Sequence, residues 1–182
     1  MWQDMKYSPN GEFLAVGCRD CHIHIFEVEM GFRRHGVCKG HRAQIMRLDW
    51  SIDSTRLRST DGVHQLLFWN TAKCAQVTSS YRMRNTRWAT VECVLGWGVQ
   101  GVWKDTMDDS AVSAVARSTD GTLLAASDDC NNLRLFRYPC LKGAQYTAVH
   151  GHMSQISRIQ WTADDHHVVT IAGVDPSIFQ VW

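Results

Sequence analysis

Residues 149–182 read VHGHMSQISRIQWTADDHHVVTIAGVDPSIFQVW, and they contain a pattern that the rest of the chain repeats. Gly151 and His152 precede an apolar series, a turn at residues 162–165, and two runs rich in Val, Ile, Thr and Phe at residues 168–172 and 178–182. Such residues suit a pleated, half-buried strand, while Asp, Gly and Pro occupy the breaks. A sheet this small cannot bury its own faces, so we expect it to pack against neighbours of the same kind.

The turn after the first predicted strand identifies four copies of the pattern. They are Ser8-Pro9-Asn10-Gly11, Ser51-Ile52-Asp53-Ser54, Ser118-Thr119-Asp120-Gly121 and Thr162-Ala163-Asp164-Asp165. The copies start 43, 67 and 44 residues apart, so one period of 43 to 44 residues holds throughout, with a single insertion. The residues six positions before each turn are predicted to be equivalent on four innermost strands: Trp2, Ile45, Val112 and Ile156.

Each copy closes with a further predicted strand, at residues 23–26, 65–69, 133–136 and 178–182. A Gly-His pair precedes the second and fourth copies, at His41 and His152. A Gly-His pair, a strand, a Ser-x-Asp-Gly-like turn and two more strands ending in Trp resemble the WD-repeat family. That family folds as β-propellers, in which each repeat supplies one four-stranded blade.

The resemblance predicts an all-β fold, a partial WD-repeat β-propeller forming an arc of about four blades with the first and last incomplete. The whole chain, residues 1–182, is expected to be part of a single propeller domain. The repeats fall at about residues 1–29, 38–78, 88–140 and 144–182, with an insertion at 81–109. Both ends look cut, so we expect the remaining blades to come from the parent chain or a partner.

Composition sets limits on function. The chain of 182 residues is 45% hydrophobic with a net charge of +1, which argues against a general nucleic-acid binder. No run of about twenty apolar residues is present, so no membrane partner is expected, and the amino terminus lacks the apolar core of a signal peptide. Seven cysteines, an odd number scattered through predicted strands, fit reduced cytosolic thiols better than a disulfide framework.

The WD-repeat resemblance implies a buried hydrogen-bond chain of a histidine, a Ser or Thr, a turn Asp and a Trp. In the second repeat it assigns His41, Ser59 and Trp69, but Val63 stands six residues before Trp69, so we expect this chain to be broken. In the fourth repeat it assigns His152, Thr170 and Asp175.

Such a histidine, hydroxyl and carboxylate set could suggest a catalytic triad. These groups instead satisfy one another inside a blade, where buried polar groups need partners. No other nucleophile with a base, phosphate-binding loop or paired carboxylates can be placed, so we predict no catalytic residue and no enzyme.

The segment Cys18-Arg19-Asp20-Cys21-His22 has the C-x-x-C-H spacing of c-type haem attachment, and it could also begin a zinc site. We favour ordinary strand and turn positions, because Asp20 falls where a WD repeat places its turn aspartate and no second C-x-x-C pair follows. No cofactor and no metal site are therefore predicted. Residues 31–36, with Arg33, Arg34 and His35, are predicted to form a solvated turn, although they could touch an acidic partner.

The insertion is the one departure from the repeat. Residues 74–77 are a candidate outer strand, yet residues 88–95 form a second extended run, so one of the two is surplus and should pack as an extra layer or rim loop. Arg82, Arg84 and Arg87 precede this run and are candidate partner contacts. Three tryptophans and three aspartates follow: Trp88, Trp97, Trp103, Asp105, Asp108 and Asp109. The tryptophans either cover an exposed blade edge or take part in recognition.

The chain also resembles a more specific family. The segments that carry the similarity are Trp88-Ala89-Thr90, Cys93-Val94-Leu95-Gly96, Gly101-Val102-Trp103, Asp128-Asp129, Leu135-Phe136-Arg137-Tyr138-Pro139-Cys140 and Ser177-Ile178-Phe179-Gln180. They look like the closing blades of the echinoderm microtubule-associated protein-like family, from about Cys38 onward. Val181 between Gln180 and Trp182, and Gly98 in place of a larger residue, depart from the family pattern.

This second resemblance implies a microtubule-associated protein built from two fused propellers, with this chain in the last part of the second. The expected function is a non-catalytic interaction module that binds or regulates microtubules within the full-length protein, in the cytoplasm on the microtubule cytoskeleton. The alternative is a generic scaffold or adaptor for other proteins without a direct cytoskeletal role. The basic residues at 82–87 favour the first, because the surface of tubulin is acidic.

Overall fold

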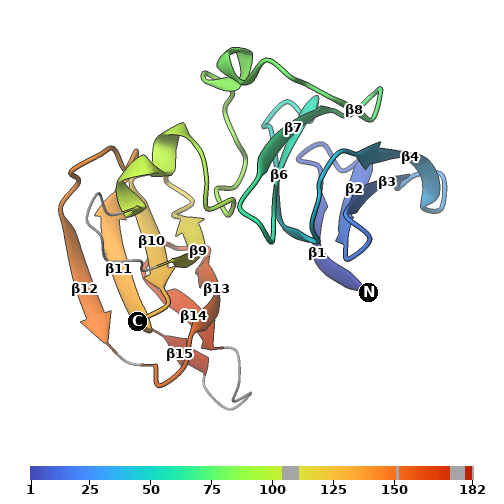
Figure 1. Ribbon diagram of the computed structural model, residues 1–182. Coiled ribbons are helices and arrows are strands. Elements are labelled where there is room, and N and C mark those ends of the chain that lie inside the picture. Colours follow the sequence, from blue (N-terminus) through green and yellow to red (C-terminus); the bar gives the residue numbers. More distant parts are fainter. Residues whose placement is uncertain (104–110, 151, 173–178, 182) are drawn as a thin grey trace. The chain divides into compact units, whose positions relative to one another are not determined.

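A computed structural model describes residues 1–103, 111–150, 152–172 and 179–181 of the chain. The chain divides into two compact units, a first unit at Met1–Leu95 and a second unit at Gly96–Trp182. Within the described residues both units consist of antiparallel sheets and short 3-10 helices (Figure 1). The all-β prediction is confirmed.

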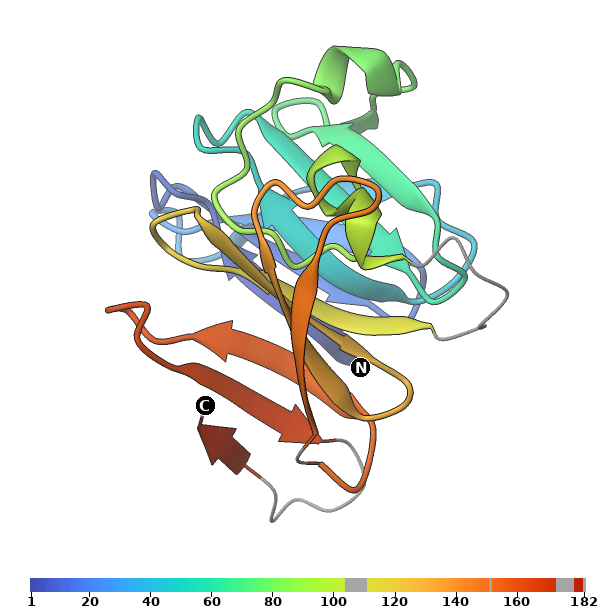
Figure 2. The same cartoon turned by 90° about the vertical axis from the view of Figure 1, so that its left-hand side faces the viewer.

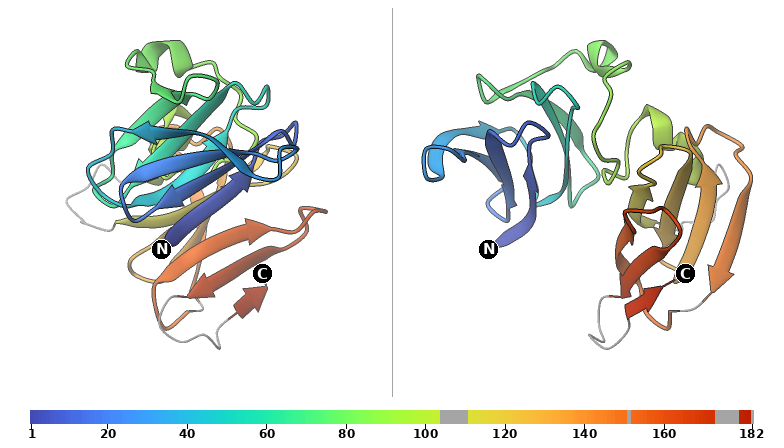
Figure 3. Two further views of the ribbon diagram at one scale, coloured as in Figure 1. Left: turned by 90° about the vertical axis from the view of Figure 1, so that its right-hand side faces the viewer. Right: turned by 180° about the vertical axis from the view of Figure 1, so that it is seen from behind.

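The first unit contains two four-stranded sheets, each a simple meander of consecutive strands (Figures 1 and 3). The first sheet has the strands β1 (Trp2–Tyr7), β2 (Phe13–Cys18), β3 (His22–Glu27) and β4 (Arg33–Lys39). The second sheet has β5 (Ile45–Trp50), β6 (Arg56–Asp61), β7 (Leu66–Asn70) and β8 (Ala75–Gln76). The 3-10 helix η1 (Ser80–Met83) follows.

The second unit begins with the 3-10 helix η2 (Trp97–Val102). Its four-stranded sheet has β9 (Val112–Arg117), β10 (Leu123–Asp128), β11 (Asn132–Arg137) and β12 (Tyr146–His150). Its last sheet has three strands, β13 (Ile156–Trp161), β14 (Val168–Ala172) and β15 (Phe179–Val181), drawn in red in Figure 2.

The repeated turn is the local device that sets the register. The hydroxyl of Ser8 accepts a hydrogen bond from the Phe13 amide at 2.9 Å. The same bond, from a backbone amide to the hydroxyl of the first turn residue, recurs in the other three copies. The pairs are Arg56 to Ser51, Leu123 to Ser118 and His167 to Thr162. The fourth turn residue has positive φ in every copy: 76° at Gly11, 60° at Ser54, 74° at Gly121 and 55° at Asp165. This left-handed position explains the glycines, which adopt it without a steric penalty.

The four residues predicted to be equivalent are confirmed as such. Each is the first residue of the first strand in its sheet, and each pairs with the last residue of the next strand. The four residues are Trp2, Ile45, Val112 and Ile156. A register shift follows each of these pairs. The sequence spacing therefore determined both the strand and the position on it.

The predicted solvated turn at residues 31–36 is wrong from Arg33 onward. Strand β4 begins there and pairs with β3, with Glu27 opposite Arg33. The Glu27 carboxylate accepts a hydrogen bond from the Arg33 side chain at 2.6 Å and lies 3.0 Å from Nδ1 of His35. These contacts lower the pKa of Glu27. The first sheet consequently has all four strands, although the sequence indicated an incomplete first blade.

Consecutive sheets pack in the same way inside each unit. In the first unit, Ile45, Leu48 and Trp50 of β5 belong to one buried cluster with residues of β2 and β3. The indole Nε1 of Trp50 donates to the Lys6 backbone oxygen at 3.0 Å. In the second unit, Trp161 Nε1 donates to the Ala116 oxygen at 2.9 Å, at the matching positions. A repeated sheet-to-sheet contact is what a propeller requires of its blades.

Candidate interaction surface

The insertion begins in the first unit, where it runs along the edge of β5. The Ile52 amide donates to the Arg87 oxygen at 2.9 Å, and the Ala89 amide donates to the Trp50 oxygen at 2.8 Å. An isolated bridge joins Ser51 and Trp88. Strand β8 takes the outer position beside β7, so the run at 88–95 is the surplus one, and it packs against β5 in the first unit.

A single buried carboxylate anchors this run. Asp49 of β5 is 0% exposed, and it accepts hydrogen bonds from the Thr90 hydroxyl at 2.6 Å and the Cys93 amide at 3.0 Å. The Glu92 amide also donates to it, at 3.0 Å. Three donors within four residues of the insertion therefore converge on one side chain. This arrangement fixes the path of the backbone.

Two cations neutralise Asp49. Arg58 of β6 donates from Nε to Asp49 Oδ2 at 3.0 Å, and Lys6 Nζ lies 3.4 Å from Oδ1. Lys6 Nζ also lies 2.5 Å from Glu92 of the insertion. Burial opposes ionisation of Asp49, but Arg58, Lys6 and the hydrogen bonds from Thr90 and Cys93 together outweigh it, and the pKa of Asp49 is lowered. The network joins β1, β5, β6 and the insertion through charge-assisted hydrogen bonds.

Trp88 packs into this structure and is only 7% exposed. The Arg58 guanidinium lies 4.7 Å from the centre of its ring, and the Phe68 ring stacks on it at 6.0 Å. Trp88 therefore covers the sheet, which is one of the two roles considered for the tryptophans. Trp97 and Trp103, in the second unit, are half-buried.

The three candidate contact residues lie just before the anchored run. Arg82 belongs to η1 and Arg84 follows it, while the intervening Met83 is buried. The side chains of Arg82, Arg84 and Arg87 are all exposed. The acidic half of the insertion, Asp105, Asp108 and Asp109, lies outside the described residues. The first unit thus presents an exposed basic segment, Arg82, Arg84 and Arg87, whose backbone is hydrogen-bonded to the second sheet at Arg87.

Comparison with known proteins identifies the chain. A model of the second β-propeller of echinoderm microtubule-associated proteins matches residues 1–182. The chain belongs to the echinoderm microtubule-associated protein family. It is 40% identical over 180 residues to echinoderm microtubule-associated protein-like 2 of Rattus norvegicus, covering 97% of this chain and 28% of that protein.

Two further relatives match the same part of the chain. The 77 kDa echinoderm microtubule-associated protein of Strongylocentrotus purpuratus is 39% identical over 97% of this chain and 26% of its own length. Echinoderm microtubule-associated protein-like 3 of Homo sapiens is 38% identical over 97% of this chain and 20% of its own length. The chain spans about a quarter of the length of these relatives. The partial WD-repeat propeller predicted from the sequence is thereby confirmed.

In this member of the family, the structure places His41, Ser59 and Trp69 in one buried chain. The Ser59 hydroxyl lies 2.6 Å from His41 Nε2, and Trp69 Nε1 donates to the same oxygen at 2.7 Å. The expectation of a broken chain is wrong, because Asp61 supplies the carboxylate at 3.0 Å from His41 Nδ1. Val63 is exposed and takes no part. The carboxylate comes from the end of β6 instead of the following turn.

The hydrogen bonds that join Asp61, His41, Ser59 and Trp69 stabilise the fold. An ionised Asp61 can only accept, so Nδ1 of His41 carries the proton and Nε2 accepts from the Ser59 hydroxyl. Burial, opposed by Asp61, lowers the pKa of His41 and keeps the ring neutral. Because the Trp69 indole donates to the Ser59 oxygen, the hydroxyl is occupied on both sides and enclosed. This geometry gives no accessible nucleophile.

The fourth repeat keeps part of the chain. His152 Nε2 lies 2.6 Å from the Thr170 hydroxyl, and burial lowers the pKa of His152. Ala172 occupies the register position that Asp61 holds in the second sheet. Asp175 lies outside the described residues.

The structure also shows residues that sequence reasoning missed, namely Lys6, Asp49, Arg58 and Glu92. A signal was present, because Asp49 stands between Leu48 and Trp50 in a run predicted to be a buried strand. A charge in such a position needs a partner. The partners come from three other segments, so the sequence alone could not name them.

Replacing Asp61 with alanine should lower the free energy of unfolding by about 1–3 kcal/mol, because it leaves His41 without its carboxylate partner. The matched change Val63→Ala should alter it by less than about 0.5 kcal/mol, since Val63 is 63% exposed. Urea unfolding followed by circular dichroism measures both. Equal effects of the two substitutions would show that Asp61 does not complete the hydrogen-bond chain of His41.

Proposed function

We propose that this chain is a non-catalytic interaction module that binds or regulates microtubules within a longer microtubule-associated protein of the cytoplasm and cytoskeleton. Membership of the echinoderm microtubule-associated protein family supports this, since the relatives are named for that association. We further propose that all four sheets belong to one propeller domain, and the match of one propeller model to residues 1–182 supports this. The remaining blades then belong to the parent chain.

The exposed basic segment, Arg82, Arg84 and Arg87, is the proposed contact. Exposed cations attract an acidic surface such as that of tubulin, and attraction across an interface raises the association rate and helps select the partner. The segment suits this role because Asp49 and the β5 edge hold the adjoining backbone. Loops carried by a rigid sheet scaffold commonly hold binding residues.

Reversing the charge of all three arginines to glutamate should weaken co-sedimentation of the protein with microtubules by roughly tenfold at low salt, where such contacts are strongest. The loss should shrink as salt is added, because ions screen exposed charges. A matched control reverses three other exposed cations of the first unit, Lys39, Arg42 and Lys73. This control carries the same net charge change.

Two outcomes would contradict the proposed contact. If the arginine variant sediments like the parent protein, the basic segment does not touch tubulin. If both variants lose binding equally, net charge and not this segment governs the interaction. A protein that folds but does not bind microtubules at all favours the scaffold alternative, in which other proteins are the partners.

A further inference from the structure

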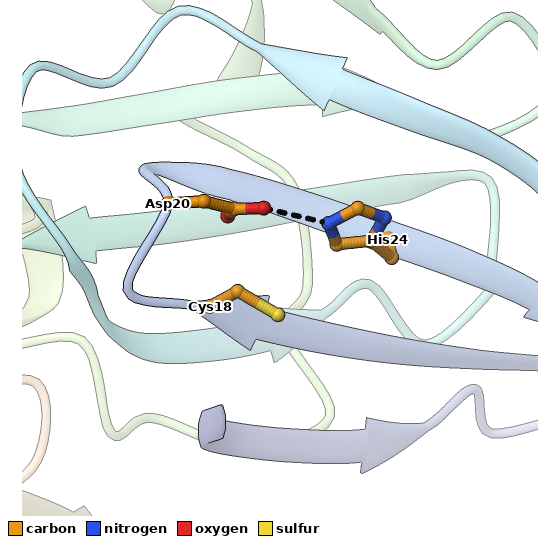
Figure 4. Close-up of side chains that lie close together, drawn as sticks. All are labelled: Cys18, Asp20 and His24. Carbon is orange, nitrogen blue, oxygen red and sulfur yellow. Dashed lines mark hydrogen bonds and ion pairs between the residues drawn. The ribbon is translucent and has the colours of Figure 1, made fainter. Parts of the chain in front are cut away.

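Cys18, Asp20 and His24 lie together at one end of the first sheet (Figure 4). Cys18 ends β2, Asp20 lies in the turn that follows, and His24 lies on β3. One donor atom from each side chain lies within 4.8 Å of the donor atoms of the other two. A thiol, a carboxylate and an imidazole therefore converge on one point.

We propose that these three side chains bind a divalent transition-metal ion of the zinc type, with a fourth position open to water. Zinc accepts sulfur, nitrogen and carboxylate oxygen, whereas magnesium and calcium are held by oxygen alone. Ligand atoms around a tetrahedral zinc ion lie roughly 3.5 Å from one another. His24 Nε2 and Asp20 Oδ2 are 3.1 Å apart, which is close to this spacing.

The positions of Cys18 and His24 in the first sheet match those of Asp128 and Arg134 in the four-stranded sheet of the second unit, where the two side chains are in contact. His24 pairs with Val16 across β2 and β3, and Arg134 pairs with Ala126 across β10 and β11. Cys18 and Asp128 lie two residues beyond those partners. In the second unit, Asp128 and Arg134 form an ion pair across this gap. The first sheet replaces two opposite charges with two metal ligands, and the turn adds Asp20.

Two further features bear on the site. The three side chains lie on a groove of about 490 Å³ whose other lining residues are mostly apolar. The His22 amide donates to Asp20 Oδ1 at 3.0 Å and so orients the carboxylate.

The set differs from the C-x-x-C-H pattern in the sequence. Among the described residues, the cluster includes Cys18 but neither Cys21 nor His22. Cys21 has a φ of 66°, and its sulfur lies 3.9 Å from the Arg19 oxygen. Cys21 is therefore a matched control for Cys18, three residues away and also a thiol.

The test uses the protein stripped of metal by a chelator and titrated with Co²⁺, followed by competition with Zn²⁺. We expect a thiolate-to-cobalt charge-transfer band that saturates at one ion per chain and disappears when Zn²⁺ is added. Cys18→Ser should abolish the band. His24→Leu, which places the residue found at the same register in β7, and Asp20→Asn should each weaken binding by at least about tenfold.

Cys21→Ser should leave the band and the affinity unchanged. Circular dichroism of each metal-free variant shows that it is folded, and Asp20→Asn changes only an exposed turn if the other variants fold poorly. Absence of a thiolate band in the folded parent protein would overturn the proposal. So would a band that persists in Cys18→Ser, or one that is lost in Cys21→Ser. These outcomes are independent of microtubule binding.

Discussion

Replacing Asp49 with alanine should lower the free energy of unfolding by about 3–5 kcal/mol, because removing one partner of a buried ion pair leaves the others uncompensated. Arg58 would then lie in the protein interior without its carboxylate, and Lys6 would keep only the Glu92 carboxylate. The amides of Glu92 and Cys93 would also lose an acceptor. Urea unfolding followed by circular dichroism measures the change. Glu29→Ala, at an exposed acidic residue, should change stability by less than about 0.5 kcal/mol.

The same substitution should release the insertion. Trypsin cleaves after arginine, so digestion at Arg82, Arg84 and Arg87 reports how firmly the adjoining backbone is held. Faster cleavage in Asp49→Ala than in Glu29→Ala is expected under conditions where both variants remain folded. Unchanged cleavage together with unchanged stability would show that Asp49 does not anchor the segment.

Acid should reproduce part of this effect. The folded state lowers the pKa of Asp49, so this group stabilises the fold fully above its unfolded value of about 3.9. That contribution is lost as the pH falls through the lower, folded value, because both states are then protonated. Asp49→Asn should therefore show a weaker loss of stability with acidification than the parent protein. An identical acid dependence would contradict the assignment of a lowered pKa.

Replacing Trp50 with alanine should lower the free energy of unfolding by about 3–5 kcal/mol, since it removes a large buried aromatic ring. Trp50 is 1% exposed, and it stacks on Phe13 with ring centres 6.5 Å apart. Its indole also donates to the Lys6 oxygen. Trp50→Phe retains most of the ring and should cost only about 1–2 kcal/mol, from the lost hydrogen bond and a smaller cavity.

Trp161 provides the matched comparison, because it makes the equivalent hydrogen bond but is only half-buried. Trp161→Ala should therefore destabilise the protein less than Trp50→Ala. Circular dichroism is the appropriate measurement, since the substitutions themselves change tryptophan fluorescence. A cost below about 1 kcal/mol for Trp50→Ala would show that this side chain does not hold the two sheets together.

Much of the fold was predictable because it depends on local chemistry. The hydroxyl that begins each turn and the positive φ at its fourth residue recur in all four copies. Their spacing predicted the strands and the equivalence of Trp2, Ile45, Val112 and Ile156. Strand β4 was missed because its Arg33-Arg34-His35 start has no apolar alternation. Pairing with β3 and ion pairs to Glu27 make it a strand, and these are contacts between segments.

The candidate site likewise has features that the sequence predicts and features that depend on contacts between distant segments. The exposed arginines and the unusual length of the insertion are properties of the sequence, and so are the family motifs. Which carboxylate completes the His41 chain was decided by tertiary structure, because strand register directs Asp61 and not Val63 toward the ring. The anchor at Asp49 and the cluster of Cys18, Asp20 and His24 were decided in the same way.

The sequence by itself determined the all-β class, the period of the repeat, the turns and the family. It did so because turn geometry and strand alternation depend on residues that are neighbours in the chain. Only the tertiary structure decided which charges meet, since Lys6, Asp49 and Glu92 are separated by some forty residues at each step. These contacts matter for stability because Asp49 is buried. An ionised carboxylate out of contact with water is stable only where the fold brings cations and hydrogen-bond donors to it.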